Sequence, residues 1–216
     1  MLRVEAKQIV NYCYLIYLPG SSRALLVDPA WDAERIESVL TQCGLQLYAI
    51  LLTHHHWDHV NKADELARKH KVSVYMSRVE IHHYGFNCSH LVSLEQGHRQ
   101  FGDLSVQTIS TPGHTRGSVC YRIGNHLLTG DTLFIEGCGL CNENADSSSD
   151  MYASLARLHD TIPDGVRVYP GHRFRAPPGA RMKDVRNSNP YLNLPRHEFM
   201  QRVALRQHSA NQFTYL

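Results

Sequence analysis

The feature that most constrains this chain is a run of four histidines and one aspartate within six positions, in the stretch ILLTHHHWDHV. The apolar residues before the run predict a buried strand, because a continuous apolar segment is typical of a strand covered on both faces. Histidine and aspartate are poor core residues, so the strand is expected to end near them. A loop leading from a strand into a helix is a usual place for a functional site, because the rigid sheet edge positions it.

The spacing inside the run favours metal binding. His54 and His56 lie two residues apart, so in extended backbone their side chains point to the same side. Asp58 and His59 follow where a helix is expected to begin, and neutral imidazole and carboxylate groups are good ligands for zinc or iron. One divalent ion would resolve the crowding of the histidines, and the alternative is a solvated loop that is merely rich in histidine. His55 alternates to the other side and is interpreted as a residue that does not bind metal.

Three further segments place a metal-binding type of residue beside glycine at the end of a predicted strand. They are STPGHT with His114, LLTGDTLF with Asp131 and VYPGH with His172. Glycine lets the backbone turn sharply and approach neighbouring groups closely. Each segment alone is typical of a turn, but together with the histidine run they predict one shared metal site.

Composition narrows the class of protein. Of the 216 residues 43% are hydrophobic, which indicates a globular protein, and the net charge of only +2 gives no indication of nucleic-acid binding. No apolar run approaches the roughly 20 residues of a membrane span, so no membrane interaction is expected. The first residues lack the pattern of an export signal. The six cysteines have no framework spacing, and they therefore predict free thiols in a reducing cytoplasm.

The predicted elements are a mixture of strands and helices. Strands are predicted in NYCYLIYL, ALLVDPA, LYAILLTH and VSVYMS, in several short segments between residues 91 and 134, and in RVYPGH. Helices are predicted after Asp32, in NKADELARKHK, in EFMQRVALRQ, and in DMYASLARLHDTI with Asp150 or a nearby serine as its cap. We expect a single α/β domain over residues 1–216, with two sheets and helices packed outside them.

The segments THHHWDH, PGHT, TGDTLF and YPGH together resemble the metallo-β-lactamase fold, specifically its glyoxalase II-like branch. The resemblance spans nearly the whole chain, from LLVDPA to NPYL. It implies an αββα sandwich of two mixed β-sheets flanked by helices, with the site at one edge of the sheets. It also implies two zinc ions, with iron as the alternative metal, held by seven residues: His54, His56 and His114 on one ion, Asp58, His59 and His172 on the other, and Asp131 on both.

The reaction that this resemblance implies is hydrolysis, because each metal ion lowers the pKa of bound water. A thioester is the expected substrate, since its thiolate leaves without a strong general acid. A metal-bridging hydroxide then attacks, while Asp58 and Asp131 act as ligands with any role as a base secondary. Asp28, at the end of the second strand, either supports the ligands or is a turn carboxylate that caps backbone amides.

The segments GDTLFIEGCG and NPYL are similar to the zinc-dependent hydrolases of bacterial polyketide biosynthesis clusters. This similarity implies an acyl thioester carried by an acyl carrier protein or a similar thiol carrier. One alternative is a glyoxalase II-type hydrolase of glutathione thioesters, although LCNENADSSSD stands where that group has a basic residue and aromatics. A second is a mononuclear iron persulfide dioxygenase that uses His54, His114 and Asp131, although Leu140 replaces its usual arginine. A binding module without turnover is disfavoured, because a structural zinc needs only four ligands.

Residues 166–206 carry an excess of positive charge. They hold nine lysines and arginines against Asp184 and Glu198, an excess of seven. This segment either receives an acidic carrier protein or a phosphopantetheine phosphate, or forms a solvated helix face. If it receives the carrier, charge reversal at Arg173 or Arg175 is expected to raise KM for a carrier-bound substrate but not for a small thioester.

Overall fold

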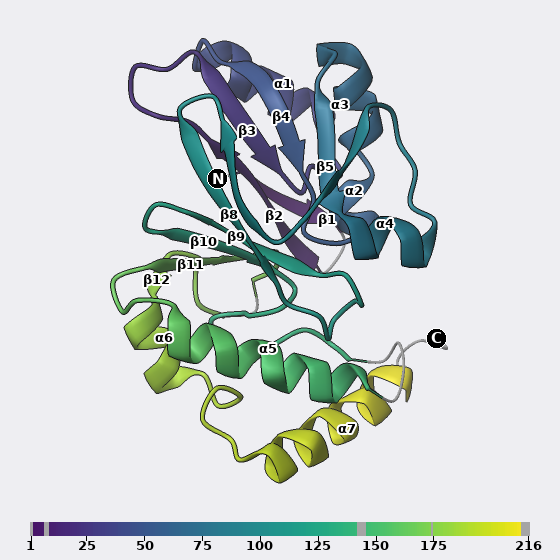
Figure 1. Ribbon diagram of the computed structural model, residues 1–216, viewed down its shortest axis with the longest axis vertical. Coiled ribbons are helices and arrows are strands. Elements are labelled where there is room, and N and C mark those ends of the chain that lie inside the picture. The colour runs from purple at the N-terminus through teal and green to yellow at the C-terminus, as the bar shows by residue number, and fades with distance from the viewer. Residues whose placement is uncertain (1, 7–8, 142–145, 174, 213–216) are drawn as a thin grey trace.

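The computed structural model describes residues 2–6, 9–141, 146–173 and 175–212. Two six-stranded sheets pack face to face, and helices cover the outer face of each sheet (Figure 1). The predicted αββα sandwich of two mixed sheets is therefore confirmed.

The first sheet has the strand order β1-β2-β3-β4-β5-β6. Its strands are β1 (Leu2–Ala6), β2 (Ile9–Ile16), β3 (Arg23–Val27), β4 (Gln46–Leu51), β5 (Ser73–Ser77) and β6 (Leu91–Leu94). The first three strands are antiparallel neighbours, whereas β3 to β6 run parallel. The carboxyl ends of these parallel strands meet at one edge of the sheet, and the histidine run leaves β4 at that edge.

The second sheet has the strand order β12-β11-β10-β9-β8-β7. Its strands are β7 (Gly97–Phe101), β8 (Leu104–Ser110), β9 (Val119–Ile123), β10 (His126–Gly130), β11 (Arg167–Pro170) and β12 (Ala180–Arg181). Only β10 and β11 are parallel neighbours, so their carboxyl ends lie together. The loop after β11 also contacts the first sheet, because the Tyr12 backbone N–H donates to the Gly171 carbonyl over 2.8 Å. The two sheets thus meet at one edge.

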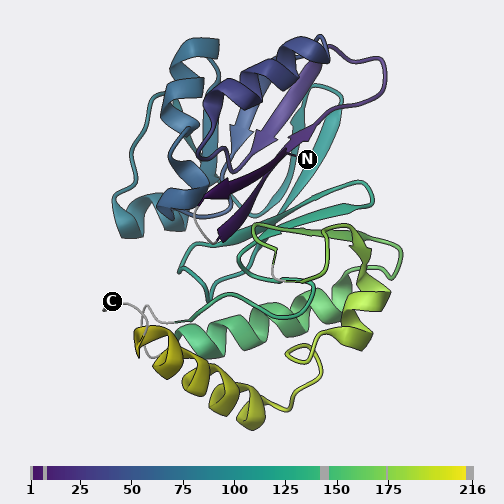
Figure 2. The same cartoon turned by 180° about the vertical axis from the view of Figure 1, so that it is seen from behind.

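The helices are α1 (Ala33–Gln42), α2 (Trp57–Val60), α3 (Ala63–His70), α4 (Arg78–Tyr84), α5 (Ser147–Thr161), α6 (Met182–Ser188) and α7 (Arg196–Gln212). Seen from behind, α1 and α3 cover the first sheet, and α5, α6 and α7 lie on the side of the second (Figure 2). The Asp32 carboxylate caps α1 by accepting from the Arg35 backbone N–H over 2.9 Å. None of the described helices combines the length and the apolar character needed to cross a membrane.

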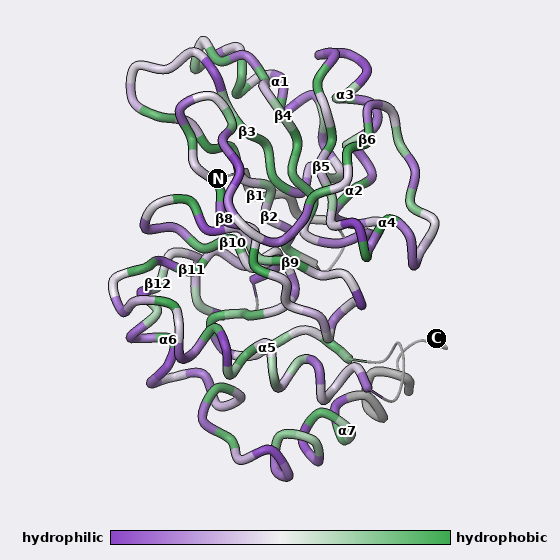
Figure 3. The backbone as a smooth tube through the Cα atoms, viewed as in Figure 1, coloured by the Kyte–Doolittle hydropathy of each residue, from purple (hydrophilic) through white to green (hydrophobic). Residues whose placement is uncertain are grey.

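Three apolar layers hold the sandwich together, and the strands that form them carry most of the hydrophobic colour in Figure 3. The first layer, with Ile36 and Ile50, joins the first sheet to its helices. The second, with Tyr121, lies between the two sheets, and the third, with Leu158 and Phe199, joins the second sheet to α5 and α7. The central layer draws residues from both sheets, so neither sheet completes its core alone.

Some elements differ from those that the sequence predicts. Helix α5 begins at Ser147, and its N-cap position is Asp146 rather than the predicted Asp150 or a nearby serine. Ser147 is 3% exposed, so tertiary packing outweighs the low helix propensity of serine. Strand β7 and helices α4 and α6 were not predicted, because β7 is mostly polar and exposed and both helices are only seven residues long.

Candidate metal centre

The seven residues that the sequence singles out lie together at the edge where the sheets meet. Six of the seven form two groups of three donors, and within each group the possible ligand atoms all lie within 4.8 Å of one another. A third such group joins Asp28 to His54 and His59. The residues come from four segments: His54 and His56 with Asp58 and His59 after β4, His114 after β8, Asp131 directly after β10, and His172 after β11. Residues up to 118 positions apart in the chain are thereby neighbours in the fold.

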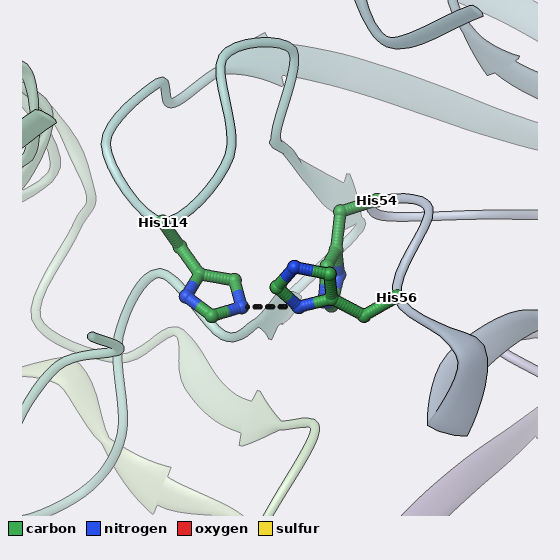
Figure 4. A group of neighbouring side chains, drawn as sticks. All are labelled: His54, His56 and His114. Carbon is green, nitrogen blue, oxygen red and sulfur yellow. Dashed lines mark hydrogen bonds between the residues drawn. The ribbon is translucent and has the colours of Figure 1, made fainter. Parts of the chain in front are cut away.

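The first group consists of His54, His56 and His114. His114 reaches across from the opposite loop, and its Nε2 lies 2.9 Å from Nδ1 of His56 (Figure 4). The ring of His54 lies edge-on to both, with centroid distances of 4.7 Å to His56 and 4.9 Å to His114. Three imidazole nitrogens therefore face one small volume, which is the arrangement that zinc prefers.

The second group consists of Asp58, His59 and His172. Nε2 of His172 lies 3.2 Å from Nε2 of His59 and 3.3 Å from Oδ2 of Asp58. Helix α2 carries both Asp58 and His59, and His59 is 1% exposed. This group offers two nitrogens and one carboxylate oxygen to a cation.

The Asp131 carboxylate lies between the two groups. Its Oδ2 is 3.6 Å from Nε2 of His114 in the first group and 3.2 Å from Nε2 of His172 in the second. Its Oδ1 is 3.4 Å from Nε2 of His59. One carboxylate thus reaches both donor groups, as a shared ligand must.

Hydrogen bonds with Asp28 fix the orientation of two of these imidazoles. The Thr53 hydroxyl donates to Oδ2 of Asp28 over 2.6 Å, so its oxygen accepts from Nδ1 of His54 at 3.0 Å. Oδ2 of Asp28 also accepts from Nδ1 of His59 over 3.1 Å, and Oδ1 accepts from the Thr53 backbone N–H. Both histidines are therefore protonated at Nδ1 and turn the lone pair of Nε2 into the site. Both alternatives for Asp28 hold at once, because it caps an amide and supports the ligands.

The donor atoms fit a divalent cation. Nε2 of His54 and Oδ1 of Asp131 are buried, and neither has a hydrogen-bond partner among the described residues. Nδ1 of His114 donates to the Leu140 carbonyl over 2.9 Å, so its Nε2 also presents a lone pair. Burying a lone pair that accepts no hydrogen bond costs free energy of folding. A metal ion at this position would bind several of these lone pairs at once.

The protonation states suit metal binding as well. Burial lowers the pKa of His54 well below its usual value and that of His56 to about 4, so both are neutral ligands at pH 7. Burial alone would raise the pKa of Asp131, but His172 and His59 hold it well below its ordinary value. Burial likewise opposes protonation of His172, yet Asp131 and Asp58 raise its pKa to about 10. The carboxylates thus stay ionised and favour a positive charge between them. Without metal this charge is the proton of His172, which a bound metal ion would displace.

Asn11 is a residue of the site that sequence reasoning missed. It is 3% exposed, and its Nδ2 donates to both the backbone carbonyl and Oδ2 of Asp58, over 2.9 Å and 3.2 Å. Asn11 also forms an isolated antiparallel bridge with His172. A single asparagine in an apolar strand belongs to no motif. Only the fold therefore reveals that Asn11 contacts two proposed ligands, Asp58 and His172.

Glu80, also missed, joins the two loops that carry the first group. It is fully buried, and Oε1 accepts from the backbone N–H of His55 over 2.9 Å and lies 2.6 Å from its Nδ1. Oε2 accepts from the Thr115 hydroxyl and from the Gly117 backbone N–H, over 2.9 Å and 2.8 Å. His55 therefore points away from the metal ligands, and Glu80 ties the loop of His54 to that of His114.

We expect Glu80→Ala to lower the free energy of unfolding of the metal-free protein by about 3 kcal/mol, because it leaves buried donors without an acceptor. Zinc affinity should fall by about 10-fold or more, since residues that orient ligands contribute on that scale. Urea unfolding and competition with a chelator measure both quantities. The matched control is Glu95→Ala, which removes an exposed partner of Arg78 and should change stability by less than about 0.5 kcal/mol. Equal effects of the two variants would show that Glu80 does not hold the loops.

A cleft of about 320 Å³ opens onto the donors. Its wall includes Asp58, His114, Asp131 and His172, with Phe134, Gly139 and Leu140 from the segment after β10 and with Arg173 and Arg206. The basic segment is thus divided. Arg173, Arg175 and Arg206 line this cleft or a second cavity beside it. Arg186 instead donates to the His159 carbonyl and pairs with the exposed carboxylate of Asp164. Residues 166–206 therefore do not form a single charged face.

The sandwich and the donor groups at its edge define a class, that of αββα proteins with a candidate metal site where the two sheets meet. More narrowly, the chain belongs to the metallo-beta-lactamase superfamily, whose family model matches residues 7–172. The family that the sequence motifs indicate is therefore confirmed.

Comparison with known proteins agrees with this assignment. The chain is 43% identical to the probable polyketide biosynthesis zinc-dependent hydrolase BaeB of Bacillus velezensis, over 87% of this chain and 84% of that protein. It is 30% identical to the cytoplasmic hydroxyacylglutathione hydrolase of Saccharomyces cerevisiae, over 95% of this chain and 78% of that protein. The crystal structure of ETHE1 from Myxococcus xanthus superposes with a TM-score of 0.83 at 28% identity, over 94% of this chain and 89% of that one.

Proposed function

We propose that this protein is a zinc-dependent hydrolase that cleaves an acyl thioester on a thiol carrier, in polyketide biosynthesis. The observation that carries the proposal is the position of Asp131 between two groups of metal-type donors. The relative named as a zinc-dependent hydrolase of polyketide biosynthesis supports both the metal and the pathway. An acyl carrier protein is the partner that fits this proposal.

In the proposed site one zinc ion would be held by His54, His56 and His114, and the second by Asp58, His59 and His172. Asp131 is placed to serve both groups. Such a pair, when bound, lowers the pKa of water and polarises the carbonyl of the substrate. Asn11 and Asp28 keep the ligands in place, and Asp58 and Asp131 serve as ligands first and as bases second.

The lining of the cleft favours a thioester over an amide. Every carboxylate and imidazole that lines the cleft, among the described residues, belongs to the two donor groups or is Asp131. The arginines that remain stay protonated at neutral pH and are poor proton donors. A leaving amine needs a proton from a general acid, whereas a thiolate leaves without one.

Two predictions from the sequence also remain proposals. We propose that residues 1–216 act as one domain, which the shared core layer between the sheets supports. We further propose a location in the cytoplasm, since all six cysteines are free thiols, as a reducing compartment would keep them.

Chelation is expected to abolish thioester hydrolysis, because no side chain of the cleft replaces a metal-activated nucleophile. Activity against acetyl-pantetheine, followed by release of the thiol, should fall by about 10³-fold after dialysis against a chelator. Addition of two equivalents of zinc should restore it. Undiminished hydrolysis after complete removal of metal would contradict the proposed function.

The same preparations separate hydrolysis from the iron-dependent alternative. A hydrolase should contain zinc and consume no oxygen with any thiol substrate. One iron per chain together with oxygen uptake on glutathione persulfide would favour the dioxygenase. Hydrolysis of glutathione thioesters in preference to pantetheine thioesters would favour the glyoxalase II-type activity instead.

A further inference from the structure

A second cavity of about 470 Å³ lies beside the metal cleft. Phe134 and Arg206 line both, so these two side chains form the wall that the cavity and the cleft share. The rest of its lining includes Arg175, Tyr191, Ser188 and Glu136. None of these residues belongs to the donor groups of the candidate metal centre.

The charge of this cavity is predominantly positive. Neither Arg175 nor Arg206 forms a salt bridge with any carboxylate among the described residues. Glu136, the acidic residue of the lining, accepts a hydrogen bond from the Ala176 backbone N–H and so holds the segment that carries Arg175. Two guanidinium groups therefore remain available to an anion that enters.

Arg206 is held at the boundary between the cavity and the cleft. One of its terminal nitrogens donates to the Cys138 carbonyl over 2.6 Å, and its guanidinium carbon lies 6.0 Å from the centre of the Tyr191 ring. A guanidinium has five N–H donors, so most of them are still free to bind a ligand. Phosphate oxygens match this planar array of donors well.

We propose that this second cavity binds the phosphate of a 4′-phosphopantetheine arm while the thioester at the other end of the arm occupies the metal cleft. The inference rests on the proposed thioester hydrolase function and names the substrate class that its site accepts. Arg175 and Arg206 bind the phosphate, and the arm passes Phe134, which contacts both spaces. Coenzyme A and a carrier protein present the same arm, so the cavity recognises the chemistry that they share.

The first test compares acetyl-4′-phosphopantetheine with acetyl-pantetheine, which lacks only the phosphate. The wild-type protein should hydrolyse the phosphorylated compound with a kcat/KM about 10-fold higher or more, the scale of one hydrogen bond to a charged group. Arg175→Gln should lower this ratio, because only Arg206 would remain to bind the phosphate, and should leave the rate with acetyl-pantetheine unchanged. Lys183→Gln is the matched control, because Lys183 belongs to the same basic segment but lines neither space. An unchanged ratio in Arg175→Gln would overturn the proposal.

A second test measures binding without turnover and separates the sources of the arm. Calorimetric titration with S-methyl-4′-phosphopantetheine, which has no thiol to bind metal, should show weaker binding to Arg175→Gln and unchanged binding to Lys183→Gln. The Arg175 effect should appear with acetyl-coenzyme A as well as with an acetylated carrier protein. An effect confined to the carrier protein would overturn the phosphate site in favour of a protein-docking surface. If no thioester is hydrolysed, the proposed function fails, while the titration still decides whether the cavity binds the phosphate.

Discussion

Asp131→Asn is expected to lower kcat/KM for thioester hydrolysis by about 10³-fold, which corresponds to about 4 kcal/mol of transition-state stabilisation. The carboxylate lies 3.6 Å from the first donor group and 3.2 Å from the second, so its loss affects both. Asparagine offers one neutral oxygen in place of two charged ones, and its amide nitrogen cannot bind zinc. Zinc content, measured by elemental analysis, should fall from two ions per chain to one or fewer.

The matched control for this variant is Asp103→Asn, in the exposed turn between β7 and β8. It removes the same charge far from the donors and should keep both zinc ions and full activity. A urea midpoint of metal-free Asp131→Asn close to that of the wild-type protein would show that the loss is not one of folding. Retention of two zinc ions and full turnover in Asp131→Asn would contradict its role as the shared ligand.

Gly171→Ala is expected to disrupt the same centre by steric conflict. A Cβ at residue 171 would lie 2.5 Å from Cε1 of His59 and 2.6 Å from Oδ1 of Asp131. Both distances are shorter than the non-bonded contacts that Cβ atoms make in proteins. Both are proposed ligands, so the variant must move a ligand or shift the loop after β11. A displacement of about 1 Å at a reacting centre costs about 10²-fold in rate, and we expect a loss of at least that size.

Gly165→Ala provides the control, since a Cβ there meets no atom within 4 Å and the backbone at this glycine is not left-handed. It should leave zinc content and kcat/KM at the wild-type values. If Gly171→Ala behaved like Gly165→Ala, the loop after β11 could not lie against His59 and Asp131 as it does here.

The sequence predicts the parts of this molecule that have a local pattern. Continuous apolar runs predict β3 and β4, and the polar groups that follow strands predict where the donors gather. Asp131 and His172 follow β10 and β11, and because these two strands are parallel neighbours their carboxyl ends bring both residues to one edge. The motifs therefore point to the residues that gather at this edge, whereas the division of the seven residues between two ions comes from the family resemblance and stays a prediction.

Residues that act through long-range contacts were beyond the reach of sequence reasoning. Asn11 and Asp58 are 47 positions apart, and Glu80 contacts residues 25 and 37 positions away. Neither residue belongs to a motif, because an asparagine in a strand and a glutamate in a short helix are ordinary. The basic segment shows a different limit. Its charge is evident in the sequence, but only the fold shows that Arg175 and Arg206 line a cavity whereas Arg186 pairs with Asp164.

The most direct test of the proposed two-zinc site is an anomalous difference map, recorded at the zinc absorption edge from crystals of the protein as isolated. We predict two peaks: one enclosed by His54, His56 and His114, the other by Asp58, His59 and His172, with the Asp131 carboxylate in contact with both. A single peak, or none at these donors in a protein that hydrolyses thioesters, would contradict the proposal.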